Sequence, residues 1–242
     1  MDSRNFPLEA LIAKVQRLSP VDDEDIAALR SLSHRTDRRR SQQYIVREGD
    51  KPTECCLLVD GYAARSKLSA EGGRQIVSFH VSGDMLDLQH LFLDRADHFV
   101  QAMTDVTLAW IPMPALRELI SNRPRVGTAF WRDALIDASI FREWVLNVGR
   151  RDAKTRIAHM LCEFITRSEA AGLGSVESMR LPFTQEQIGD ATGLTAVHVN
   201  RMLRELTEEG LIRRSPGMLQ VRDWSGFRRV AAFDAAYLHA AA

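Results

Sequence analysis

The residues whose types suggest chemistry gather near the C-terminal end of this 242-residue chain. They are the arginines Arg201, Arg204, Arg213 and Arg214. A guanidinium group can donate two hydrogen bonds to a guanine base, or it can bind phosphate. Arg201 is the best candidate for reading a base, and the alternatives are a phosphate contact or an intrahelical pair with Glu205. Any of these roles depends on the elements that hold the arginines.

A short helix followed by a sharp turn is expected just before these arginines. Thr184 is a good N-cap, and Gln187 three residues later completes a capping box. The helix is predicted over residues 185–191. Gly193 then follows where a tight turn requires a left-handed backbone.

A second helix follows the turn, with Thr195 as its N-cap, and is predicted from residue 196 to about 209, where Gly210 ends it. Gly189 is small at the point where the two helices come closest. The apolar positions suited to helix crossing are Ile188, Leu194, Val199 and Met202. Together these features predict a helix-turn-helix, and a helical hairpin without a DNA role is the alternative.

In a helix-turn-helix, the first part of the second helix enters the major groove of DNA. The candidates for base contact are therefore Ala196, Val197, His198, Asn200, Arg201 and Arg204. Ala196 and Val197 suit thymine methyl groups or close approach, and His198 suits a phosphate or water contact better than a metal. Helix N-termini attract phosphates, so Thr184, Gln185 and Thr195 are further candidates.

A β-hairpin is expected after the second helix. Residues 211–214 and 219–221 are its strands, and residues 215–218 form the turn. This hairpin has the place of a wing, from which Arg213 and Arg214 could contact the DNA backbone.

An all-β unit is predicted between Tyr44 and Ile111, after helical segments within residues 8–33. Turn glycines recur there, and the expected strands are Cys55–Val59, Tyr62–Leu68, Gln75–His80, Phe99–Met103 and Thr107–Ile111. A small antiparallel barrel or β-roll fits this pattern, and a β-sandwich is the alternative. On one of these strands Cys55 and Cys56 point to opposite faces. We expect all three cysteines, including Cys162, to be reduced and packed.

A long helix is predicted from Val126 to about Arg150, followed by another over residues 152–170. The long helix has an apolar seam typical of a coiled coil, formed by Trp131, Ala134, Ala138, Phe141, Val145 and Val148. A second stripe is formed by Phe130, Leu135, Ile140 and Trp144. Two stripes indicate a helix buried against its own roll and against a partner copy. The alternative is an ordinary amphipathic helix.

The composition of the chain excludes few classes of protein. The net charge is zero, which by itself gives DNA binding no support. The stretch from Met1 to Pro20 is unlike a signal peptide, and no apolar run approaches the roughly 20 residues that a bilayer requires. We therefore expect a cytoplasmic protein with no membrane partner. The sequence shows no nucleophile–base pair, metal-ligand cluster or phosphate-binding loop, so we expect no enzymatic activity.

The order of parts resembles the Crp/Fnr family of bacterial regulators over nearly the whole chain. The entry to its sensor roll resembles residues 44–50, with Gly61 and Gly83-Asp84 at later turns, and its DNA-reading segment resembles residues 184–201. The resemblance implies an α+β fold with an N-terminal antiparallel, jelly-roll-like β-roll and flanking helices, then a dimerisation helix and a C-terminal winged helix-turn-helix. The corresponding boundaries are 1–124 for the cyclic-nucleotide-binding-like domain, 125–151 for the helix and 152–242 for the DNA-binding domain.

The same resemblance implies a homodimer on palindromic double-stranded DNA, with RNA polymerase as a further partner if the chain is an activator. An effector in the roll would control DNA affinity, but the chain departs from members that bind cyclic AMP. At the positions where those members bind the phosphate of cyclic AMP, this chain has Asp87-Leu88 and His98-Phe99. Asp87 would repel a phosphate and Phe99 would fill its space, so we expect no response to cyclic AMP.

Other cofactors are not expected either. An iron–sulfur cluster requires four thiolates, and the chain has three cysteines. Heme binding remains an alternative because His80, His90 and His98 lie in the roll. A small-molecule or heme-binding sensor module in which DNA binding is secondary is therefore the alternative function.

Val197 stands where many members have a glutamate that contacts cytosine, so the DNA half-site should differ from theirs. The effector, the operator and the direction of regulation are not set by these residues.

Overall fold

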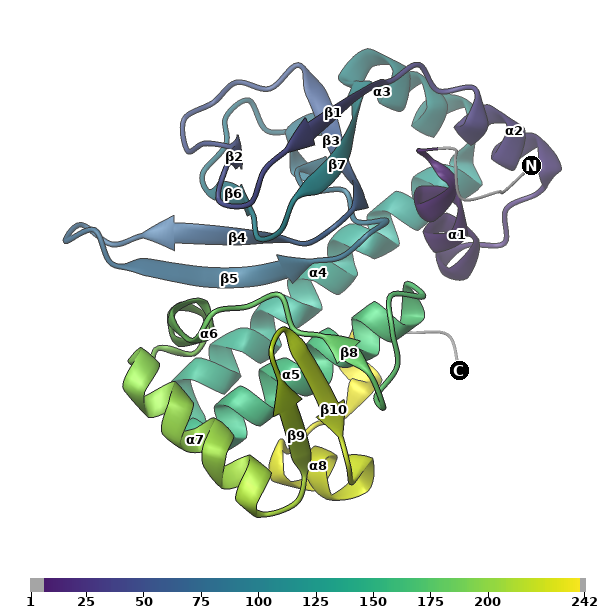
Figure 1. The fold of residues 1–242 in the computed structure, drawn as a ribbon. Coiled ribbons are helices and arrows are strands. Elements are labelled where there is room, and N and C mark those ends of the chain that lie inside the picture. The colour runs from purple at the N-terminus through teal and green to yellow at the C-terminus, as the bar shows by residue number, and fades with distance from the viewer. Residues whose placement is uncertain (1–6, 240–242) are drawn as a thin grey trace. The chain divides into compact units, whose positions relative to one another are not determined.

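The computed structural model describes residues 7–239, which divide into two compact units (Figure 1). The first unit contains residues 7–66 and 80–138, and the second contains residues 67–79 and 139–239. The long helix α4 (Pro124–Arg150) contributes its first half to one unit and its second half to the other. Among the described residues, no helix is long and apolar enough to cross a membrane.

The first unit is built on a β-roll. The sheets of this roll have the strand orders β1-β7-β3 and β2-β6-β4-β5, and the end of β4 and most of β5 belong to the second unit. The strands are β1 (Arg35–Arg39), β2 (Tyr44–Val46), β3 (Glu54–Asp60), β4 (Ala63–Leu68), β5 (Arg74–His80), β6 (Phe99–Ala102) and β7 (Val106–Pro112). β7 pairs antiparallel with β1 and β3, and β6 pairs antiparallel with β2 and β4, which confirms the predicted antiparallel roll.

The alternation of side chains along β3 builds a core on each face of that strand. Cys56 and Leu58 join a core that includes residues of β4, β6 and β7. Cys55 and Leu57 join a second core, which includes residues of the helices. The two cysteines therefore point to opposite faces, as predicted. Both thiols are free, and burial raises the pKa of each above its usual value.

The helical side of the roll is formed by α1 (Glu9–Leu18), α2 (Asp23–Arg30), α3 (Met113–Asn122) and the start of α4. Asp22 and Asp25 form a capping box that starts α2. The sequence predicts helical segments over residues 8–33 but neither α3 nor the charged strand β1. A short 3₁₀ helix, η2 (Leu88–Leu91), lies between β5 and β6.

Two ion pairs join α4 to the roll. The Lys14 ammonium lies 2.8 Å from Asp84 Oδ1 and 2.7 Å from Asp133 Oδ1. Arg65 Nη1 donates to Asp137 Oδ2 at 2.7 Å. Burial by itself lowers the pKa of Lys14, but the two carboxylates outweigh it and raise the pKa above its usual value. The lysine therefore stays charged between Asp84 and Asp133.

The second unit contains a helical group and a small sheet. The helices are α5 (Ala153–Ala170), α6 (Gln185–Thr192), α7 (Ala196–Glu208), α8 (Trp224–Val230) and the 3₁₀ helix η3 (Ala235–Leu238). The sheet has the order β8-β10-β9, with β8 (Met179–Arg180), β9 (Ile212–Ser215) and β10 (Met218–Val221). An aromatic cluster supports this unit, in which Phe79 stacks on Phe183 at 4.1 Å between ring centroids. The sequence predicts α5, α6, α7 and the β9–β10 hairpin but not β8, α8 or η3.

Substitution of Gly61 tests how tightly the turns of the roll are packed. Its φ is +91°, and a Cβ atom there would lie 2.5 Å from the carbonyl oxygen of Asp105. Gly49 has φ of +89° with no atom within 4 Å of its Cβ position. We expect Gly49→Ala to lose about 1 kcal/mol from positive φ alone, and Gly61→Ala to lose about 1–3 kcal/mol more from overpacking. Urea unfolding of the two variants measures the difference, and equal losses would contradict the close contact.

Candidate nucleic-acid interface

The first helix of the candidate interface begins with the predicted capping box. The Gln187 backbone N–H donates to Thr184 Oγ1 at 3.2 Å, and the Thr184 N–H donates to Gln187 Oε1 at 2.8 Å. These bonds satisfy two backbone donors that a helix N-terminus otherwise leaves unpaired. Gln185, the first residue of α6, is exposed beside this cap.

The turn between α6 and α7 depends on two glycines. Gly193 caps α6 with φ of 68°, in the left-handed region that the sequence predicts. At Gly189 a Cβ atom would lie 2.4 Å from the carbonyl oxygen of Leu194, so the predicted closest approach of the two segments is confirmed. The Leu194 N–H also donates to the Gly189 carbonyl at 3.0 Å. The turn is therefore fixed by backbone contact.

The second helix, α7, separates an apolar face from a polar one. Thr195 is its N-cap and accepts from the His198 N–H at 3.3 Å. The buried face carries Val199, Met202, Leu203 and Leu206, as an amphipathic helix requires. The exposed candidates are Ala196, Val197, Arg201 and Arg204, with His198 and Asn200 half-buried. Val197 is 82% exposed, which leaves its methyl groups free to meet an apolar surface.

The polar side chains of α7 contact one another and α6. Arg201 Nη2 donates to His198 Nε2 at 2.8 Å, a contact that takes the place of the pair with Glu205 considered from the sequence. Since a guanidinium group has no acceptor, His198 Nε2 is unprotonated in this contact. Gln185 Nε2 donates to Asn200 Oδ1 at 3.4 Å. Residues from both helices thus form one polar surface.

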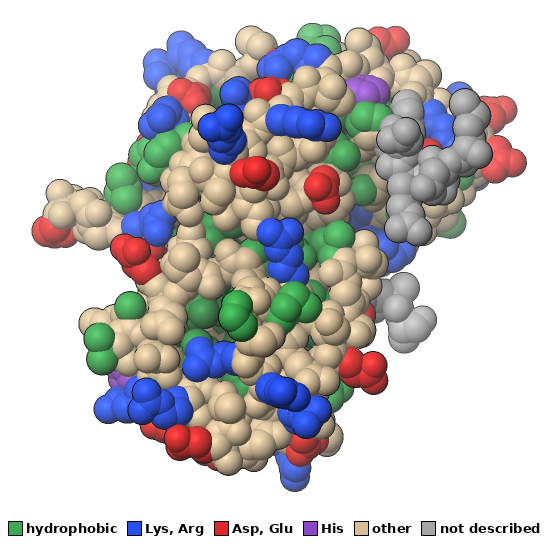
Figure 2. All heavy atoms as spheres, in the orientation of Figure 1, with side chains coloured by type: hydrophobic (Ala, Val, Ile, Leu, Met, Phe, Trp, Pro, Cys, Tyr) green, Lys and Arg blue, Asp and Glu red, His purple; other side chains and the backbone are tan. Residues whose placement is uncertain are grey.

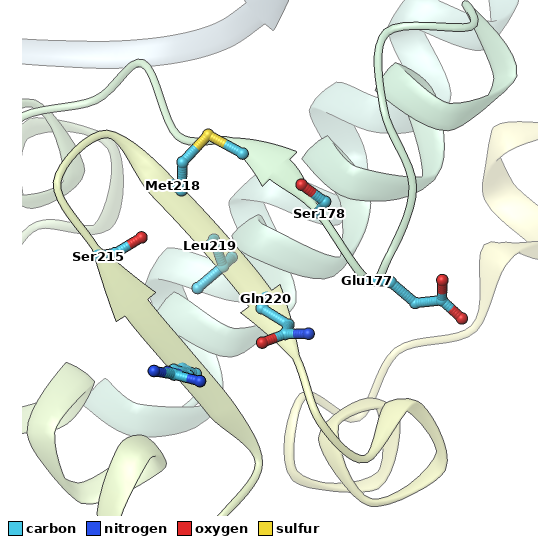
Figure 3. A pocket seen from close by; sticks show the side chains of 7 residues that line it. Glu177, Ser178, Ser215, Met218, Leu219 and Gln220 are labelled. Carbon is cyan, nitrogen blue, oxygen red and sulfur yellow. The ribbon is translucent and has the colours of Figure 1, made fainter.

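The predicted wing is present, with β8 as a third strand that the sequence does not reveal. Arg213 is opposite Gln220 and Arg214 is opposite Leu219 in the β9–β10 pair. Arg213 is exposed and lines a pocket of about 310 Å³ (Figure 3) with Glu177, Ser178, Ser215, Met218, Leu219 and Gln220. The wing therefore presents polar groups as well as Arg213.

Arg214 is the second arginine of the predicted wing and lies beside Arg213 on β9. Burial, and then the charge of Arg204, lowers the pKa of Arg214 below its usual value. Two guanidinium groups from different elements therefore repel each other at one place, where an anion would relieve the repulsion. In Figure 2, Lys and Arg side chains also gather on the surface of the second unit beside a histidine.

The candidate effector residues of the roll are arranged differently from the sequence expectation. Asp87 is fully buried and accepts from the Cys56 N–H at 2.7 Å. His98 Nδ1 lies 2.7 Å from Asp97 Oδ1, and Leu88 packs against the core of the helical side. Phe99 alternates on β6 with the buried His98 and Val100, and its ring centroid lies 5.5 Å from that of Tyr44.

Arg65 is a basic residue that sequence reasoning misses. Its buried guanidinium donates through Nη2 to the Leu86 carbonyl at 3.0 Å and through Nη1 to Asp137. Burial lowers the pKa of His80 and of His98, and the charge of Arg65 lowers both further. Among the residues that the structure describes, no group of three or more His, Cys, Asp or Glu side chains could hold a metal ion.

The seam predicted on α4 is mostly exposed. Its exposed members are Trp131, Ala134, Ala138, Phe141 and Val145, and Val148 is half-buried. Phe130, Ile140 and Trp144 are buried as expected for the second stripe. Leu135 is wrongly placed in that stripe, because it is exposed beside Ala134 on the seam's side of the helix.

Comparison with known proteins agrees with this arrangement. Residues 37–123 match the cyclic nucleotide-binding domain model, and residues 155–230 match the Crp-like helix-turn-helix domain model. The nitrogen fixation regulation protein FixK of Rhizobium meliloti is 31% identical over 172 residues, 69% of this chain and 73% of that protein. The chain belongs to the Crp/Fnr family.

Other relatives extend the likeness of this Crp/Fnr protein. The transcriptional activator protein FnrL of Cereibacter sphaeroides is 27% identical over 194 residues, 79% of this chain and 77% of that protein. The structure of FixK2 from Bradyrhizobium japonicum has a TM-score of 0.76 at 24% identity, covering 84% of this chain and 100% of that one. The fold is therefore that of the family.

Gly189 offers a test of the turn that positions α7. We expect Gly189→Ala to destabilise the protein by about 1–3 kcal/mol, because the added methyl overlaps the Leu194 carbonyl. Gly149→Ala, in α4, is the control, because its Cβ position has no atom within 4 Å and alanine favours helix by up to about 1 kcal/mol. Thermal and urea unfolding measure both changes. A Gly189→Ala variant as stable as Gly149→Ala would contradict the close approach.

Proposed function

We propose that two copies of this chain bind a palindromic site in double-stranded DNA, each placing α7 in a major groove. Members of the Crp/Fnr family are transcription regulators, and this chain is a DNA-binding transcription regulator of that type. The observation that carries the proposal is that one face of α7 exposes Val197, Arg201 and Arg204. The opposite face of the helix is buried. The relatives do not favour the alternative of a sensor whose DNA binding is secondary.

The side chains have distinct roles in this proposal. Arg201 donates to the O6 and N7 atoms of guanine, while Ala196 and Val197 approach thymine methyl groups. His198 and Asn200 orient the polar surface through their contacts with Arg201 and Gln185. The groups that face phosphates are Thr184, Gln185, Thr195, Arg204, Arg213 and Arg214.

The dimer forms through the exposed seam of α4, defined by Trp131, Ala134, Ala138, Phe141, Val145 and Val148. A water-exposed apolar row of this length is costly for a monomer and is suited to a second identical helix. A two-fold dimer places the two α7 helices about 34 Å apart, one turn of DNA. This spacing is what a palindromic operator requires.

The remaining assignments belong to the same proposal. The sensor domain covers residues 1–124, the dimerisation helix 125–151 and the DNA-binding domain 152–242. The chain works in the cytoplasm without enzymatic activity, and as an activator it would also contact RNA polymerase.

The roll does not bind cyclic AMP in this proposal. A bound phosphate needs backbone amides and a free guanidinium group in the site. The Asp87 carboxylate already accepts from the Cys56 amide, and the guanidinium of Arg65 is paired with Asp137. Both kinds of phosphate ligand are therefore used within the chain.

Arg201→Ala tests base reading. The cognate site is first selected from a random DNA pool with the wild-type protein. We expect Arg201→Ala to weaken binding to that site by about 1–3 kcal/mol and to relax preference at one base position. Arg38→Ala, an exposed arginine on β1, is the matched control. Gel-shift titration measures both, and unchanged cognate affinity for Arg201→Ala would refute this role.

Thermal unfolding with cyclic AMP tests the roll. A ligand that binds the folded state at a hundred times its Kd stabilises it by about 2.7 kcal/mol. We expect no shift in Tm with millimolar cyclic AMP and no change in DNA affinity. A saturable rise in Tm would show that the phosphate finds a site despite Asp87 and the paired Arg65.

A further inference from the structure

An exposed apolar patch on the first unit extends beyond the seam of α4. It consists of Phe92, Leu93, Trp131 and Leu135, which are 68%, 56%, 60% and 62% exposed. The rings of Phe92 and Trp131 are stacked with their centroids 5.8 Å apart and their planes at 24°. Single exposed apolar residues are ordinary, but a contiguous patch that includes two aromatic rings marks an interaction surface.

The segment that presents Phe92 and Leu93 is held in place. Their backbone N–H groups both donate to the Gln89 carbonyl, at 3.0 and 2.9 Å. Arg117 donates to the adjacent Leu91 carbonyl through Nε at 3.1 Å and Nη2 at 2.8 Å. Two apolar side chains are therefore fixed in an exposed position instead of folding back into the core. A partner that covers them meets an ordered surface with little conformational entropy left to lose.

The position of the patch identifies its occupant as a second copy of this chain. Trp131 belongs both to the patch and to the α4 seam, so whatever covers the seam also reaches the patch. In a two-fold dimer the same surface meets itself, which brings like charges together. The exposed residues next to Leu93, Asp94 and Arg95, carry opposite charges, so neither sign is in excess at that point of the segment.

We propose that Phe92 and Leu93 of each copy pack against α4 of the other copy, around Trp131 and Leu135. The dimer interface then includes the roll as well as the long helix. This inference rests on the proposed dimer and deepens it by naming a contact outside the helix seam.

This contact gives the segment from Asp87 to Leu93 two ends with different surroundings. At one end Asp87 is fully buried and accepts from the Cys56 amide, and His90 stacks on His98 with 6.0 Å between ring centroids. At the other end Phe92 and Leu93 meet the partner.

Sedimentation velocity over a dilution series of the full chain tests this inference. The double variant Phe92→Ser/Leu93→Ser is expected to raise the dimer Kd by at least about tenfold, equivalent to about 1.4 kcal/mol. Leu68→Ser is the matched control, because Leu68 is exposed on β4 and lies outside the patch. Its Kd should stay within about twofold of wild type. Circular dichroism of each variant verifies that the fold is retained.

Val145→Asp, in the seam of α4, tests the dimer separately from the roll contact. We expect this variant to be monomeric whether or not Phe92 contacts the partner. If Val145→Asp is monomeric while the double variant dimerises like wild type, the dimer stands and the roll contact is wrong. Equal weakening by Leu68→Ser would also overturn the roll contact, since it would show a nonspecific effect. A wild-type protein that stays monomeric at high concentration would overturn both.

Discussion

The structure depends on the neutralisation of two carboxylates on α4 by a lysine of α1 and an arginine of β4. Asp133 pairs with Lys14, and Asp137 pairs with Arg65. Separating Lys14 from Asp133, or removing Asp137 from the buried Arg65, leaves a charge in a poorly solvated place. The first half of α4 is therefore held in one orientation on its own unit. In that orientation Phe130 is buried in the core and Trp131 is exposed, so the pairs and the apolar core together leave the seam uncovered.

The helix-turn-helix could be predicted from sequence because its constraints are local. The capping box at Thr184, the left-handed Gly193 and the close approach at Gly189 all act within a few residues, and each requires a particular residue type. The seam of α4 was predictable for a similar reason, since helical periodicity assigns residues to faces without knowledge of the partner. The alternation at Cys55 and Cys56 follows in the same way from strand geometry.

Other features could not be predicted, because they depend on contacts between distant residues. β1 has four charged residues among its five and is a strand only because β7 pairs with it. α3 follows Pro112 and contains Pro114, which indicate the end of the β unit but do not predict a helix, although proline is tolerated in the first turn of one. The tie between Arg65 and Asp137 joins residues 72 positions apart. The closeness of Arg204 and Arg214 likewise requires the folded wing.

The arrangement of charge explains how a chain with no net charge can present a DNA-binding face. Equal numbers of acidic and basic residues do not prevent local excess, because surface charges beyond about 10 Å are largely screened at physiological salt. In the first unit, Lys14, Arg65 and Arg123 are paired with carboxylates. On the candidate interface Arg201 contacts the neutral acceptor of His198, and Arg204 lies near Arg214 without neutralising it. Whether arginines are left for DNA therefore depends on where the carboxylates are placed, not on an excess of arginine over the whole chain.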